Sequence, residues 1–272
     1  MNWSRVTLFS FALRHFGRFS SYHQLLRYAG GCRTMDVAVP LANILRSSWH
    51  RKLGPRWRRL SEWRLRPVFV RRERQCVHYL HPGDTLFHGH KWKGRHGLVL
   101  TLHAPAAWIR EAGEIKSTAH FEALKKADRV IVLSTDSVAG YEEFCCRRRM
   151  VVIPHGVDVH FFRPPAMPKH KPLVLTVGNW LRDYEFWAEA ALRLAAANAG
   201  VEFAVVAAPP VVAKVRAKVE GIFPGRIRFL SELSDEKLRE IYQQAAVVFI
   251  PLTGATANNA IVESWLAELP WC

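Results

Sequence analysis

Long apolar runs and metal-binding cysteine spacings are both missing from this sequence. No apolar stretch approaches the roughly 18 residues that a membrane-spanning helix needs. The apolar run 6–13 is followed by basic residues from Arg14 onward and by no small-residue cleavage site, which favours a buried first strand over a signal peptide. The five cysteines form an odd set, and adjacent Cys145 and Cys146 are poorly placed to form a disulfide. Reduced thiols in a cytoplasmic protein are therefore predicted.

Acidic residues are scarce in the first part of the chain. Residues 1–165 carry 28 Lys/Arg against 12 Asp/Glu, whereas residues 166–272 carry 11 of each, so the first part holds the whole net charge of +16. This asymmetry predicts two domains with different partners. Four prolines within 163–172 exclude the interior of a helix or strand and mark the change of charge balance. The predicted domains are therefore 1–165 and 166–272.

Short apolar or β-branched runs alternate with helical segments along the chain. Strands are predicted at 6–11, 77–80, 98–102, 130–133, 151–153, 173–177, 201–207, 227–230 and 247–250. Helices are predicted at 120–127, 137–145, 184–197, 211–219, 233–244 and 259–267, with Ser234 as an N-cap. This alternation predicts an α/β fold of two Rossmann-like domains, each a parallel sheet covered by helices on both faces. Ligands are expected in a cleft at the carboxyl ends of the strands.

Several motifs follow one another in a fixed order. Residues 130–134 read VIVLS and residues 151–158 read VVIPHGVD; the second half contains LTVG at 175–178, LSDEKL at 233–238 and AIVESWLAELP at 260–270. Together they resemble glycosyltransferase family 4. The resemblance implies a GT-B fold, in which two Rossmann-like domains face each other across a cleft. It also implies the retaining transfer of a sugar from a nucleoside-diphosphate sugar to a hydroxyl acceptor, without a metal or other cofactor.

The sequence also departs from the family pattern. Ala255 stands where the first of two paired glutamates is usual, and Asn179 and Tyr184 replace the usual Arg and Lys. The turn that contains Arg182 resembles a subset of the family in which this arginine supplies the phosphate contact. The chain ends at Cys272, where the family continues with a further strand and helices, so the second domain is expected to be incomplete.

Donor binding is predicted first at the turn after the strand 173–177. Arg182 follows Gly178 near the start of the next helix, a position where a guanidinium can clamp phosphate oxygens. The alternative is a surface arginine that pairs with Asp183 or Glu185.

The start of the final helix supplies the other predicted donor-binding residues. Backbone amides of Asn258, Asn259 and Ala260 open this helix and can bind the same diphosphate, although plain helix capping explains an asparagine there equally well. The resemblance assigns Glu263 to the ribose hydroxyls. Its alternatives are a solvated helix glutamate or a salt bridge.

The acceptor side is predicted in the first domain. His103 closes the strand 98–102, and the family places a histidine there, facing the transferred sugar, which implies a catalytic role. An ordinary loop histidine is the alternative. The loop with Gly17, Ser20 and Ser21 resembles the family's acceptor-side loop, with a simple capped turn as its alternative.

Residues 49–74 combine arginines with tryptophans. Trp57, Leu60 and Trp63 recur every three residues among these cations, a pattern typical of a helix at an anionic membrane surface. Nucleic-acid phosphates or a solvated basic face are the alternatives. A cytoplasmic enzyme at the inner face of the membrane, with a lipid-linked or glycan acceptor, is the resulting expectation.

A different class of function also fits these motifs. A non-catalytic nucleotide-sugar-binding or scaffold protein of the same fold is favoured by Ala255 and by the end of the chain at Cys272. A basic nucleic-acid-binding protein is the third hypothesis, and it rests on the charge alone.

Overall fold

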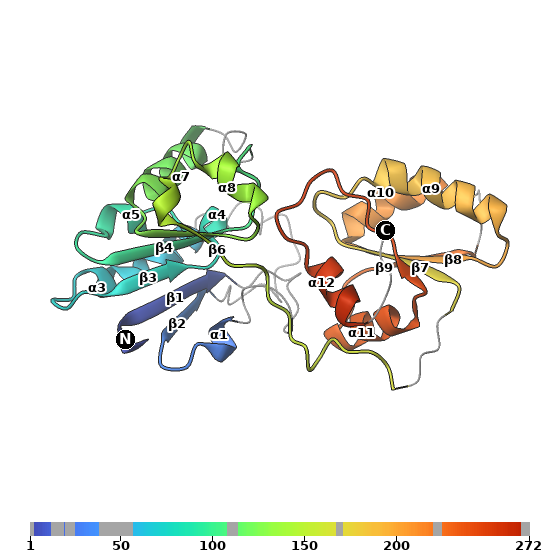
Figure 1. The fold of residues 1–272 in the computed structure, drawn as a ribbon, viewed down its shortest axis with the longest axis horizontal. Coiled ribbons are helices and arrows are strands. Elements are labelled where there is room, and N and C mark those ends of the chain that lie inside the picture. Colours follow the sequence, from blue (N-terminus) through green and yellow to red (C-terminus); the bar gives the residue numbers. More distant parts are fainter. Residues whose placement is uncertain are drawn as a thin grey trace. The chain divides into compact units, whose positions relative to one another are not determined.

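A computed structural model describes residues 3–11, 19, 25–37, 57–107, 114–166, 171–219 and 225–267. The chain forms two compact units, one of Met1–Phe16 with Tyr22–His155 and one of Gly17–Ser21 with Gly156–Cys272 (Figure 1). The predicted domains 1–165 and 166–272 divide the chain slightly later than these units do. No helix within the described ranges is long and apolar enough to cross a membrane.

The first unit is built on six parallel strands in the order β2-β1-β3-β4-β5-β6 (Figure 1). The strands are β1 Val6–Phe11, β2 Arg33–Val37, β3 Cys76–Tyr79, β4 Gly97–Leu102, β5 Arg129–Val132 and β6 Met150–Val152. Phe9 in the middle of β1 lies level with Met35 on β2 and with Tyr79 on β3. The apolar strand side chains form a core with α7 Glu114–Lys126, which contributes the buried Leu124.

The remaining helices of this unit are short. Those with described limits are η1 Trp3–Arg5, α1 Leu25–Tyr28, η3 Trp63–Leu65, α3 Arg66–Phe69, α4 Pro82–Thr85, α5 Gly89–Trp92, α8 Asp136–Tyr141 and η4 Arg147–Arg149, and residues 57–62 are helical as well. Sequence reasoning missed β2 and most of these turns. β2 lies at the edge of the sheet with apolar residues only at Met35 and Val37, and a helix of one turn is too short to show periodicity.

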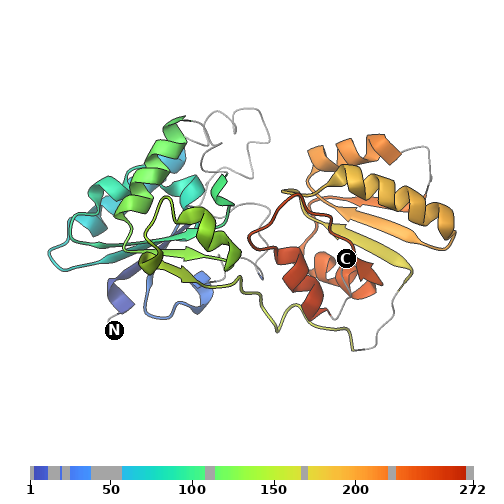
Figure 2. The same ribbon diagram turned by 45° about the horizontal axis from the view of Figure 1, so that its top comes forward.

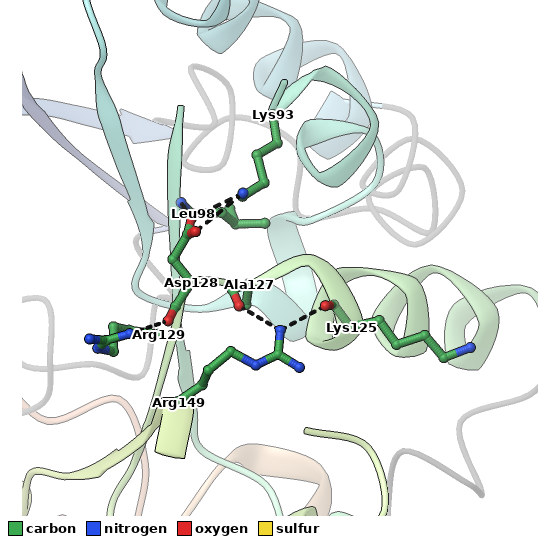
Figure 3. Close-up of polar contacts among 7 residues, drawn as sticks. All are labelled: Lys93, Leu98, Lys125, Ala127, Asp128, Arg129 and Arg149. Atoms are coloured by element: carbon green, nitrogen blue, oxygen red, sulfur yellow. Dashed lines mark hydrogen bonds and ion pairs between the residues drawn. The ribbon is translucent and has the colours of Figure 1, made fainter. Parts of the chain in front are cut away.

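A polar cluster fixes the amino-terminal edge of the first sheet (Figure 3). Asp128 Oδ2 accepts a hydrogen bond from the backbone N–H of Leu98 at 2.8 Å and lies 3.2 Å from Lys93 Nζ. Arg149 Nη1 donates to two carbonyl oxygens at the end of α7, at 2.7 and 2.9 Å, and so caps that helix. These contacts hold the starts of β4 and β5 and the end of α7 together, at the edge of the sheet opposite the carboxyl ends of its strands.

The second unit has four parallel strands in the order β10-β7-β8-β9. They are β7 Leu173–Val177, β8 Glu202–Val206, β9 Ile227–Leu230 and β10 Val247–Val248. One face is covered by α9 Tyr184–Ala197 and α10 Pro209–Val219, and the other by α11 Asp235–Gln244 and α12 Asn259–Leu266 (Figures 1 and 2). Each face has its own apolar cluster, one around Trp187 and one around Tyr242.

The α/β fold class is confirmed, and the second unit follows the predicted elements closely. β7, α9 and β9 have the predicted limits, and Ser234 caps α11 by accepting a hydrogen bond from Lys237 N at 3.2 Å. β10 is shorter than the predicted strand 247–250, although Phe249 N still donates to Leu175 O on β7 at 2.9 Å.

Candidate functional site

The strand order of the second sheet reverses between β7 and β10. Beyond β7 the chain builds β8 and β9 on one side and then returns to form β10 on the other. Open parallel sheets bind ligands outside the carboxyl ends of their strands at such a point. The segments that leave β7 and β10 there are joined by two backbone hydrogen bonds, Asp183 N to Pro251 O at 3.0 Å and Thr253 N to Leu181 O at 3.1 Å.

Arg182 lies at this point and contacts the start of α12. Its Nη2 donates to Asn258 Oδ1 at 3.0 Å, its Nε to Val177 O at 3.1 Å and its Nη1 to Trp180 O at 2.9 Å. All three acceptors are uncharged, and no carboxylate of the described chain pairs with it. Burial lowers the pKa of Arg182 from its ordinary value, but a guanidinium in a protein stays protonated at neutral pH. The site therefore holds a half-buried positive charge.

The alternative pairing of Arg182 with a neighbouring carboxylate is not observed. Asp183 caps α9 by accepting a hydrogen bond from Phe186 N at 2.8 Å, and Glu185 pairs with Lys218. The role of Arg182 in phosphate binding stays a prediction.

Gly178 lets the guanidinium lie against the backbone. Its φ of +120° is in the region that favours glycine, and a Cβ at this position would lie 2.5 Å from Arg182 Nη2. The hydroxyl of Tyr184 donates to the Gly178 carbonyl at 2.5 Å and holds the turn from the other side. Leu181, within the same turn, also has a positive φ of 55°, so the turn stores backbone strain near the candidate site.

Asn258 is the N-cap of α12 and the link to Arg182. Its Oδ1 accepts from Ala260 N at 3.1 Å as well as from the guanidinium, whereas its Nδ2 is buried without a hydrogen-bond partner. The Ala260 amide is thus engaged in the cap. The N–H of Asn259, in the first turn, has no acceptor within the helix, as at any helix start. Helix capping by Asn258 is thus observed, and the role of this helix start in diphosphate binding stays a prediction.

Glu263 on α12 is buried, with 3% of its surface exposed. The hydroxyl of Tyr242, on α11, donates to Glu263 Oε2 at 3.0 Å. Burial, and then the nearby Glu263, raise the pKa of Tyr242 well above its ordinary value, so its proton stays in place as a donor. The solvated-glutamate interpretation of Glu263 is therefore wrong. Sequence reasoning missed Tyr242, because it continues the apolar face of α11 and so resembles an ordinary core residue.

His103 lies in the first unit, directly after β4. Its Nε2 bonds to Leu80 O at 2.7 Å, and since a carbonyl only accepts, Nε2 carries the proton. Its ring stacks on His81, with centroids 4.4 Å apart, and His155 approaches edge-on at 6.1 Å. Burial lowers the pKa of His103 to about 4, and the Leu80 carbonyl opposes this shift. His103 is thus neutral at pH 7, with Nδ1 as its acceptor nitrogen.

The histidines around His103 do not form a metal site. Across the part of the chain that the structure describes, no group of three or more His, Cys, Asp or Glu side chains could hold a metal ion. His81 and His155 were not predicted as site residues, since they are separated in sequence and only the parallel sheet brings them to one edge.

The predicted acceptor-side residues Gly17, Ser20 and Ser21 lie outside the described residues. Phe19, between them, belongs to the second unit: its ring stacks on Phe161 with centroids 3.7 Å apart. Its carbonyl accepts from Asp158 N at 3.1 Å, and Asp158 Oδ1 accepts from Phe161 N at 3.0 Å.

Two parallel-sheet units with polar residues at the carboxyl ends of their strands define a Rossmann-like protein of the GT-B fold. Residues 21–161, more than half of the chain, match the profile of Glycosyltransferase Family 4, and the chain belongs to this family. Comparison with curated protein sequences finds no match.

Solved structures of the same fold share little sequence with this chain. HepE of Anabaena in complex with UDP-glucose is 14% identical, with a TM-score of 0.68 over 98% of this chain and 79% of HepE. Sucrose-phosphate synthase of Thermosynechococcus elongatus is 18% identical, with a TM-score of 0.70 over 97% and 80%. TarM of S. aureus is 12% identical, with a TM-score of 0.57 over 72% of this chain and only 39% of TarM.

Proposed function

We propose that the chain transfers a sugar from a nucleoside-diphosphate sugar to a hydroxyl acceptor, with retention and without a metal. The observation that carries this proposal is the convergence of Arg182 and the N-terminus of α12 at the switch point of the second sheet, 3.0 Å apart at Asn258. Membership of family 4 and the likeness to a UDP-glucose complex support it.

The diphosphate is bound by Arg182 and the first turn of α12. The guanidinium is already held by three hydrogen bonds, so little side-chain freedom is lost when an anion binds. Asn258 Nδ2 is a buried donor without a partner, and a ligand oxygen would satisfy it. The N–H of Asn259 and the helix dipole add further attraction for negative charge. A fixed cation at this place substitutes for a metal.

The nucleoside is bound by Glu263. The Tyr242 hydroxyl holds Oε2 of this carboxylate in place, and the carboxylate accepts hydrogen bonds from the ribose hydroxyls. Because Ala255 offers no carboxylate, the hydroxyls of the transferred sugar are recognised by backbone amides of the same loop or by Thr256.

His103 contacts the transferred sugar. As a neutral imidazole it adds no positive charge beside an anomeric carbon that becomes positive in the transition state. The bond from the anomeric carbon to the diphosphate oxygen breaks, and the bond to the acceptor oxygen forms on the same face. The departing diphosphate takes the proton of the acceptor hydroxyl. Gly17, Ser20 and Ser21 are proposed to line the acceptor side.

A thermal-shift screen with UDP-, GDP- and ADP-sugars tests donor binding. One donor is expected to raise the Tm of the wild type and to leave that of Arg182→Ala unchanged, because a ligand stabilises only the state that binds it. Arg193→Ala is the matched control, since this arginine is exposed on α9 and pairs with Glu189. Equal shifts in wild type and Arg182→Ala would refute the assigned phosphate contact.

A non-catalytic donor-binding protein is the second candidate, and the absence of a carboxylate at Ala255 favours it. Single-turnover reactions with radiolabelled donor and a membrane fraction as the source of acceptor separate the two. Saturable donor binding without label transfer would favour the non-catalytic protein.

We further propose that the acceptor is lipid-linked or a glycan, and that the protein acts in the cytoplasm at the inner face of the membrane. The basic character of the first unit supports this location.

A further inference from the structure

Four apolar side chains in one short segment of the first unit remain partly exposed. Trp57, Leu60, Trp63 and Val70 keep 42%, 60%, 46% and 71% of their surface exposed. They belong to the helical residues 57–69 and the turn after them. The core-facing side of the same segment is already filled, with Leu65, Val68 and Phe69 buried. The exposed side chains thus lie outside the buried core, although the Trp63 ring also packs edge-on against Trp92 at its border, with centroids 5.2 Å apart.

Glu62 locks this segment in its orientation. Its carboxylate is fully buried and accepts backbone N–H groups of Phe87, His88 and Gly89 at 2.8 to 3.0 Å, together with the Tyr79 hydroxyl at 2.9 Å. If the helix rotated to bury its outer face, this buried carboxylate would lose its hydrogen-bond donors, and an unpaired buried charge is energetically costly. The apolar face is thus held outward.

Arginines are frequent in the segment that carries this apolar face. Residues 57–74 contain Arg58, Arg59, Arg64, Arg66, Arg71, Arg72 and Arg74. The two acidic residues of the segment do not offset them, because Glu62 is buried and Glu73 pairs with Arg5 at 3.2 Å. Within the described chain Arg59, Arg66, Arg71 and Arg72 form no ion pair. The surface thus combines exposed rings and aliphatic groups with uncompensated positive charge.

We propose that residues 57–74 dock on an anionic lipid bilayer. Trp57, Leu60, Trp63 and Val70 enter the boundary between headgroups and acyl chains, and the arginines bind the headgroup phosphates. A nucleic acid would satisfy the arginines equally well, but it offers Leu60 and Val70 no apolar phase, so the aliphatic exposure favours lipid. The inference does not depend on sugar transfer.

Vesicle sedimentation of the full chain tests this inference. We expect binding to vesicles of equal parts phosphatidylcholine and phosphatidylglycerol, and none to phosphatidylcholine alone. Leu60→Ser should weaken the partition coefficient about tenfold, because burial of a leucine is lost. Arg71→Gln and Arg72→Gln should each weaken it about fivefold.

Matched controls lie in the second unit. Leu194→Ser removes an exposed leucine from α9, and Lys214→Gln removes an exposed cation from α10. Both should bind anionic vesicles like the wild type, and all variants should keep the wild-type Tm. The proposal would be overturned if Leu60→Ser, Arg71→Gln and Arg72→Gln bound anionic vesicles as tightly as these controls do. So would equal binding to both vesicle types, or binding of single-stranded DNA by a wild type that binds neither vesicle type.

Discussion

Gly178 is the residue on which the position of Arg182 depends most directly. In Gly178→Ala the new methyl group would clash with the guanidinium at 2.5 Å, and the positive φ would strain the backbone. We expect a loss of stability of about 1–3 kcal/mol and a loss of nucleotide affinity of at least about tenfold. Urea unfolding and calorimetry with UDP, GDP and ADP measure the two effects. Gly83→Ala is the control, since a Cβ there meets no atom within 4 Å; the same affinity loss in both variants would contradict the argument.

The Tyr242 hydroxyl gives a second prediction at this scale. In Tyr242→Phe the buried carboxylate of Glu263 loses a donor, and we expect a loss of stability of about 1–3 kcal/mol in urea unfolding. In a Glu263→Gln background the same substitution should cost less, because the charged acceptor is gone. If Tyr242→Phe reduces the free energy of unfolding equally in the wild-type and Glu263→Gln backgrounds, the Tyr242 hydroxyl and the Glu263 carboxylate are not energetically coupled.

At the scale of elements, α11 and α12 have similar caps with different consequences. Ser234→Ala and Asn258→Ala should each reduce stability by about 1 kcal/mol, because each removes the oxygen that accepts a first-turn N–H. Only Asn258→Ala should also weaken nucleotide binding, because of these two capping residues only Asn258 contacts Arg182. Thermal melts with and without nucleotide distinguish the two effects. If the nucleotide-induced rise in Tm is reduced equally in both variants, Asn258 has no specific role in nucleotide binding.

The sequence correctly predicted the elements whose apolar pattern is long, whereas the ligand roles of the residues beside them stay predictions. The limits of β7 and α9 are correct because apolar side chains fill both at the expected period. β2 was missed, since an edge strand needs few apolar residues. Tyr242 and His81 were missed for another reason: their contacts with Glu263 and His103 join segments that are distant in sequence, and only the fold creates them.

At the scale of the whole molecule, buried neutral histidines make the first unit acid-sensitive. Burial lowers the pKa values of His78, His90 and His103 from 6.5 to about 4. The unfolded chain therefore binds more protons than the folded chain between these values, and stability falls as the pH decreases from 6.5 towards 4. Urea midpoints at pH 7 and pH 5 measure this fall, which should be smaller in His78→Asn. A midpoint that is higher at pH 5 would contradict it.

Phe19 has a consequence for any attempt to divide the protein. This aromatic ring comes from the first twenty residues, yet it stacks on Phe161, whose other neighbours include the guanidinium of Arg239 at 4.6 Å. A fragment that starts at residue 156 would contain every strand of the β7–β10 sheet, but it would lack the Phe19 ring that stacks on Phe161. The second unit thus draws on two separate stretches of the chain, 17–21 and 156–272. A cut near residue 156 would therefore leave part of the second unit on the other fragment.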